Sequence, residues 1–112
     1  MTMLAAMFYA PLDVRLEQRP IPQPAAGEVL LKVAAATTCG TDVKTYLRGH
    51  PILFSHIPAG FGHEVAGIVA ATGIGVTQCA EGDVIWSQIR HHASNATTAG
   101  EVDLAFVKIY SY

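Results

Sequence analysis

The chain has few charged side chains and no long apolar run, and each shortage excludes a class of protein. Charged residues make up 14% of the sequence and the formal net charge is -2, with no basic stripe, so nucleic acid is not expected as a partner. The apolar runs are far shorter than the roughly 20 residues that a membrane helix needs, so no membrane partner is expected either.

Cysteine is also scarce. Two residues, Cys39 and Cys79, are too few for the disulfide framework of a small secreted domain. The opening residues MTMLAAM carry no charged segment of the kind that begins a signal peptide. We therefore expect a cytoplasmic, reducing location. Hydrophobic residues make up 51% of the 112 positions, which predicts one folded domain with a real core.

Short apolar segments alternate with glycine and proline turns along most of the chain. Strands are expected within 3–9, 12–17, 29–36, 60–71, 84–86 and 104–109. In the second of these, Leu12, Val14 and Leu16 alternate with charged residues, which predicts a half-buried strand. The third is apolar enough to be buried on both faces for much of its length. The pattern indicates a mostly β fold, a small and mostly antiparallel barrel.

One short helix is expected at 39–47. Thr38 is the predicted N-cap and Gly49 the predicted stop. Spacings of three and four residues predict that one face of this helix carries Cys39, Asp42, Val43 and Tyr46.

The expected helix start and the segment after 60 carry the residues with metal chemistry. Cys39 lies where the positive end of a helix dipole favours a thiolate, although a free cysteine is more often a small buried apolar group. His63 follows Gly62, which permits close approach of a ligand. Adjacent strand residues point to opposite faces, so His63 is the firmer ligand, and Glu64 is expected beside the site or as an occasional ligand.

Thr41 and Asp42 lie within one turn of Cys39 and have two interpretations. A hydroxyl beside a bound alcohol would pass its proton outward, and a carboxylate would fix the tautomer of a ligating histidine. Threonine and aspartate are equally ordinary residues for the first turn of a helix. Spacing alone does not separate these interpretations.

The remaining candidates are expected to have no role in a site. The other histidines are expected to be solvated loop residues: His50, His56, His91 and His92. Cys79 is expected to pack as a small apolar group, and Trp86 to lie in the core or at an interface.

Taken together, these segments resemble the zinc-containing medium-chain alcohol dehydrogenases. GHEVAGIV at 62–69 is similar to their G-H-E-x-x-G-x-V signature, and CGTD at 39–42 to their C-G-[ST]-D motif. GEVLLKV at 27–33 and EGDV at 81–84 match the flanking strands. The four motifs occur in the family's order, and the resemblance covers residues 1–86. The segment CGTDV at 39–43 is most similar to the polyol and threonine dehydrogenase branch of this family.

The resemblance implies a GroES-like barrel with one or two short helices, the N-terminal catalytic domain of the family, over residues 1–112. By the same resemblance Cys39 and His63 would be catalytic zinc ligands with Glu64 next to the metal. Thr41 would match the proton-relay hydroxyl, and Asp42 the carboxylate that orients the histidine. In the family, zinc polarises the oxygen of a small alcohol or polyol, and hydride passes to NAD(P)+.

The sequence departs from the family in two ways. Residues 87–100 contain no cysteine, so a structural zinc is excluded and a short loop is expected in place of the lobe that binds it. No βαβ unit with a glycine-rich turn is present, so the Rossmann domain for the nicotinamide cofactor is expected to be absent. We therefore expect a truncated domain that is inactive alone, with zinc binding that is weak or absent.

The alternative interpretation is a non-catalytic GroES-like β-barrel module that binds no metal. The loss of a partner domain would expose apolar surface, and such surface favours a homo-oligomer. Metal content distinguishes this module from the dehydrogenase domain.

Overall fold

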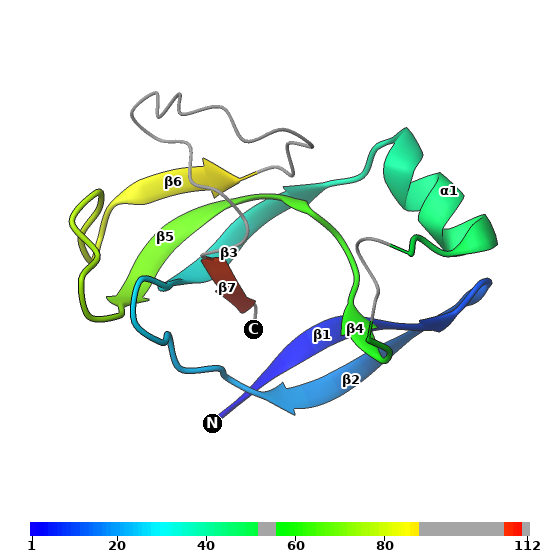
Figure 1. Ribbon diagram of the computed structural model, residues 1–112, viewed down its shortest axis with the longest axis horizontal. Helices are drawn as coiled ribbons and strands as arrows, with labels where there is room; N and C mark the ends of the chain where they lie inside the picture. Colours follow the sequence, from blue (N-terminus) through cyan, green and yellow to red (C-terminus); the bar gives the residue numbers. More distant parts are fainter. Residues whose placement is uncertain (52–55, 88–106, 111–112) are drawn as a thin grey trace.

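Two β-sheets and one helix form the computed structural model, which describes residues 1–51, 56–87 and 107–110 (Figure 1). The strands are β1 (Thr2–Ala10), β2 (Asp13–Pro20), β3 (Val29–Thr37), β4 (Ala59–Gly60), β5 (Glu64–Thr72), β6 (Val84–Ser87) and β7 (Val107–Tyr110). The helix, α1, spans Gly40–Arg48. The prediction of a mostly β fold is confirmed. No helix in these ranges is long and apolar enough to cross a membrane.

The topology brings the end of one strand beside the start of another. The smaller sheet has the order β2-β1-β4, and the larger has the order β6-β5-β3-β7. All pairs are antiparallel except β3 with β7. Because β3 and β5 are antiparallel, Thr37 at the end of β3 pairs with Glu64 at the start of β5. Helix α1 begins three residues after Thr37, so its first turn lies at this same edge (Figure 1).

The core lies on the inner face of the larger sheet. Val29, Leu31, Val69 and Ile85 form its centre, and Leu31 is completely buried. Full burial of each such side chain contributes about 1.5–3 kcal/mol relative to exposure. The core therefore holds β3, β5 and β6 together immediately below the edge where Thr37 and Glu64 pair.

A strand forms at Asp13–Pro20 as predicted, but the predicted alternation of burial is only partly present, because Val14 is half-buried and Leu16 is exposed. Leu12 and Leu16 are 62% and 72% exposed. β2 is the outer strand of the smaller sheet, and its charged face lies over Tyr9 of β1. The Tyr9 hydroxyl donates a hydrogen bond to Glu17, and the Arg15 guanidinium lies 4.2 Å from the centre of the tyrosine ring. These contacts hold Glu17 and Arg15 against Tyr9, although the Arg15 side chain stays 57% exposed.

The burial prediction for β3 is wrong in part, and the residues that share one face of α1 differ in burial. Only the first three residues of β3 are buried on both faces, and 34–37 are exposed. In α1, Val43 and Tyr46 are 57% and 40% exposed, whereas Asp42 and Thr45 are buried. The helix therefore turns a polar face toward the protein, because Asp42 has hydrogen-bond partners there.

The last strand begins at Val107, and residues 104–106 of the predicted strand lie outside the described residues. The same holds for residues 88–100 of the predicted replacement loop, which include His91 and His92.

Candidate metal centre

Cys39 is the N-cap of α1, a position that the sequence analysis gave to Thr38. Its backbone is extended, with φ -130° and ψ -178°, and Gly40 opens the helix. Asp42, the third helical residue, accepts a hydrogen bond from the Cys39 backbone N–H through Oδ2 at 2.8 Å. This bond fixes the chain at the turn from β3 into the helix. The thiol consequently lies at the positive end of the helix, where the dipole favours a thiolate.

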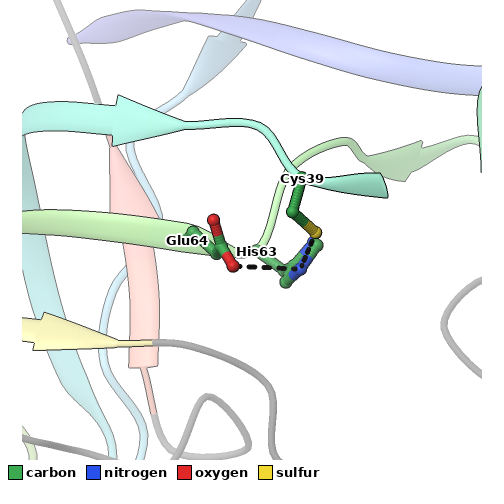
Figure 2. Close-up of side chains that lie close together, drawn as sticks. All are labelled: Cys39, His63 and Glu64. Atoms are coloured by element: carbon green, nitrogen blue, oxygen red, sulfur yellow. Dashed lines mark hydrogen bonds and ion pairs between the residues drawn. The ribbon is translucent and has the colours of Figure 1, made fainter. Parts of the chain in front are cut away.

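His63 lies in the short connection between β4 and β5, immediately before the strand starts. Gly62 has φ +105°, a left-handed conformation that favours glycine. The backbone N–H of Phe61 donates to the Ala6 carbonyl at 2.8 Å, which ties this connection to β1. The His63 side chain is buried, and its Nε2 lies 3.3 Å from Cys39 Sγ (Figure 2).

Asp42 joins the two segments that carry the cysteine and the histidine. While Oδ2 accepts from the Cys39 N–H, Oδ1 lies 3.0 Å from His63 Nδ1. A carboxylate only accepts hydrogen bonds, so Nδ1 carries the proton in this contact. The lone pair of Nε2 is then directed toward Cys39 Sγ.

Glu64 is the first residue of β5, and it also faces Cys39 and His63. Its Oε1 lies 3.9 Å from His63 Nε2 (Figure 2). Its Oε2 accepts a hydrogen bond of 2.9 Å from the Thr37 hydroxyl. The alternation of side chains along a strand predicts that neighbouring residues diverge. Here they converge because His63 precedes the strand and follows the left-handed Gly62.

The donor set of these three residues fits zinc. Thiolate, imidazole and carboxylate atoms of Cys39, His63 and Glu64 all lie within 4.8 Å of one another, the one such group found in the described ranges. Two ligands of a tetrahedral zinc, a sulfur at about 2.3 Å and a nitrogen at about 2.0 Å, are roughly 3.5 Å apart. The separation of 3.3 Å between Sγ and Nε2 is close to that value.

The other predicted residues are not members of this group. Thr41 is the second residue of α1, and no hydrogen bond links it to Cys39, His63 or Glu64 among the described residues. His50 and His56 belong to the segment between α1 and β4 and are not members of the metal-ligand group.

Cys79 packs beside the core as predicted. It contacts the cluster centred on Val29, Leu31, Val69 and Ile85. Burial raises the pKa of its thiol, and the nearby Asp83 carboxylate raises that pKa further. Both effects disfavour the thiolate that a metal requires.

Sequence reasoning missed Thr37, which holds one oxygen of Glu64. Its role depends on a cross-strand pair between positions 27 residues apart. Only the register of β3 and β5, with its two irregularities, places these residues opposite each other.

An open groove of about 380 Å³ adjoins the metal-ligand group. Thr37 and Glu64 are its polar lining residues, and Ala35, Ala66 and Trp86 line its apolar part. Trp86 is 46% exposed, so it does not lie in the core, and the alternative position at an interface stays a prediction. Its indole instead supplies an apolar wall close to Glu64.

Removing the Asp42 carboxylate is expected to lower the free energy of unfolding by about 2–6 kcal/mol. Asp42→Ala leaves two N–H groups, those of the Cys39 backbone and His63 Nδ1, without their acceptor in a buried site, at about 1–3 kcal/mol each. Urea unfolding followed by circular dichroism measures the loss.

Asp83 provides the matched control for this variant. Its Oδ2 accepts from the backbone N–H three residues earlier, at 2.9 Å, but in an exposed turn. Asp83→Ala is therefore expected to cost much less. Equal losses for the two variants would show that the buried contact with His63 contributes nothing.

The chain matches proteins of one family in both sequence and structure. The family model described as the alcohol dehydrogenase GroES-like domain matches residues 25–111. Sorbitol dehydrogenase of Gallus gallus is 41% identical over 81 residues, which cover 71% of this chain and 23% of that protein. L-threonine 3-dehydrogenase of Bacillus velezensis is 46% identical over 72 residues, 62% of this chain and 20% of that protein.

The solved structure of a cobalt- and zinc-bound thermostable alcohol dehydrogenase from Pyrobaculum aerophilum superposes with a TM-score of 0.72 at 29% identity. The match covers 88% of this chain and 30% of the other. The chain therefore spans about a quarter to a fifth of the length of the sorbitol and threonine dehydrogenases that it matches.

These matches agree with the fold and with the motifs at 39–42 and 62–69. The family model spans more than half of the chain and includes α1, β5 and the Cys39–His63 contact. The chain therefore belongs to the zinc-containing medium-chain alcohol dehydrogenase family, of which it carries the GroES-like domain.

Proposed function

We propose that this chain is the metal-holding half of a zinc-dependent, NAD(P)-linked alcohol dehydrogenase. The observation that carries the proposal is the convergence of Cys39 Sγ, His63 Nε2 and a Glu64 carboxylate oxygen within 4.8 Å. The names of the relatives support the substrate class, because sorbitol and threonine both bear an oxidisable hydroxyl group. The proposed substrate is a small alcohol or polyol.

In this proposal each side chain has a defined task. Cys39 and His63 hold the metal, and Glu64 completes the protein ligands or lies next to them. Asp42 accepts from His63 Nδ1–H, so that Nε2 keeps its lone pair for the metal. Zinc, when bound, supplies the positive charge that lowers the pKa of an alcohol hydroxyl.

Thr41 is proposed to accept the proton that the alcohol loses. It lies two residues after Cys39 in the first turn of α1, and a hydroxyl both accepts and donates. The NAD(P)+ that takes the hydride is proposed to bind a separate nucleotide-binding domain, because the described residues form no βαβ unit. This chain alone is therefore expected not to oxidise alcohols with NAD+.

The two free thiols support a cytoplasmic location. Zinc binding is expected to be weaker than at a closed structural site with four protein ligands, since the described residues supply three ligands and leave the fourth position open for the alcohol.

The test is whether an alcohol reaches a metal bound by this chain. Cobalt(II) is added to the metal-free chain, and the visible absorption is followed while ethylene glycol is titrated in. We expect a saturable change of the cobalt bands, because the hydroxyl enters the coordination shell. The dimethyl ether of ethylene glycol is the matched control and is expected to cause a much smaller change. Cobalt bands that respond to neither compound would contradict alcohol binding at this metal.

A further inference from the structure

The Thr37 side chain forms a hydrogen bond with one of the two carboxylate oxygens of Glu64. The hydroxyl donates to Oε2 at 2.9 Å, and the other oxygen, Oε1, is left facing His63 Nε2 at 3.9 Å. A carboxylate is planar, so a hydrogen bond at one oxygen sets the direction of the other. The orientation of Glu64 is thus fixed from the neighbouring strand.

The sheet register makes this contact a rigid one. Thr37 and Glu64 are direct cross-strand partners at the edge where β3 ends and β5 begins. Directly opposed side chains on neighbouring antiparallel strands lie within hydrogen-bonding reach. Glu64 is otherwise half-exposed, with a side chain that is 28% accessible and free to sample other rotamers. The Thr37 bond therefore selects the rotamer that faces Cys39 and His63.

From this geometry we infer that Thr37 is a positioning residue that holds Glu64 in place as the third protein ligand of the metal. The inference rests on the proposed function, since it requires a metal at Cys39 and His63. Thr37 acts through Glu64 and does not itself touch the metal or the alcohol. Thr37 lines the same groove as Trp86.

The test is a cobalt(II) titration of the metal-free 112-residue chain and of three variants. Thr37→Val removes the hydroxyl and keeps a β-branched side chain of the same shape, which suits a strand. We expect about a tenfold loss of cobalt affinity, the lower end of the range for residues that orient a ligand, because this hydrogen bond is exposed. The visible cobalt bands should also change, since the carboxylate no longer occupies one geometry.

Two variants separate this role from a general effect on the fold. Thr37→Ser restores the hydroxyl and is expected to recover most of the affinity and the wild-type spectrum. Thr38→Val makes the same change at the next exposed threonine and is expected to bind cobalt like the wild type. Wild-type affinity in Thr37→Val, or an equal loss in Thr38→Val, would overturn the inference.

A double variant shows whether Thr37 acts through Glu64. In a Glu64→Ala background, Thr37→Val is expected to have no further effect on cobalt affinity. A full tenfold loss in that background would overturn the inference while leaving the metal centre intact. A wild-type chain that binds no cobalt would overturn the proposed function and this inference with it, so the two failures are distinguishable.

Discussion

Replacing Cys39 by alanine is expected to weaken zinc binding by about 100- to 1,000-fold. Zinc sites with four protein ligands bind with roughly 10–16 kcal/mol, or about 3–4 kcal/mol for each ligand, and every 1.4 kcal/mol is a factor of ten. Cys39 supplies the one sulfur of the group, at 3.3 Å from the ligating nitrogen of His63. Equilibrium dialysis against buffered zinc measures the loss.

The variant is expected to stay folded, because the hydrogen bond at this position comes from the backbone. The Cys39 N–H still donates to Asp42 Oδ2 when the side chain is alanine. Cys79→Ala is the matched control, since it removes the other cysteine from the edge of the core. It is expected to lower stability slightly and to leave zinc affinity unchanged. If both variants bind zinc equally well, Cys39 is not a ligand.

Gly67→Ala is expected to have the largest effect on stability, more than about 4 kcal/mol. A Cβ at position 67 would lie 2.1 Å from the Lys32 carbonyl oxygen and 2.9 Å from the Lys32 carbonyl carbon. Backbone atoms cannot swing aside as a flexible side chain would, so β3 and β5 must move apart. This pair of strands carries the central core and the Thr37–Glu64 contact.

Gly60→Ala tests whether any loss comes from the contact or from glycine itself. Nothing lies within 4 Å of a Cβ at position 60, in the short strand β4. Its stability is expected to change by less than about 1 kcal/mol. Thermal unfolding followed by circular dichroism compares the two. A Gly67→Ala chain that unfolds at the wild-type temperature would contradict the close approach of β3 to β5.

The sequence predicts the strands well, because their signals are local. Alternating and continuous apolar segments, with Gly27 and Gly82 in left-handed turns between them, mark β1, β3, β5 and β6. Burial is harder to predict. Leu16 has the pattern of an inward residue, yet it is 72% exposed, because β2 is the outer strand of the smaller sheet.

The sequence also predicts only part of the candidate metal centre. The motifs that carry Cys39 and His63 are visible in the sequence, and their contact agrees with the prediction. The position of Glu64 is not visible, because it depends on the left-handed Gly62 and on the exact start of β5. The contact of Thr37 depends on the register of two strands that are distant in sequence. Long-range register leaves no local signal.

Cys39, His63 and Glu64 are expected to bind one zinc ion together. X-ray absorption spectroscopy at the zinc edge, on the chain loaded with one equivalent of zinc, reads the ligand atoms directly. We predict one sulfur at about 2.3 Å, with nitrogen and oxygen ligands at about 2.0–2.2 Å. A zinc shell of nitrogen and oxygen alone, or a folded chain that retains no zinc, would contradict the account and favour a metal-free barrel module.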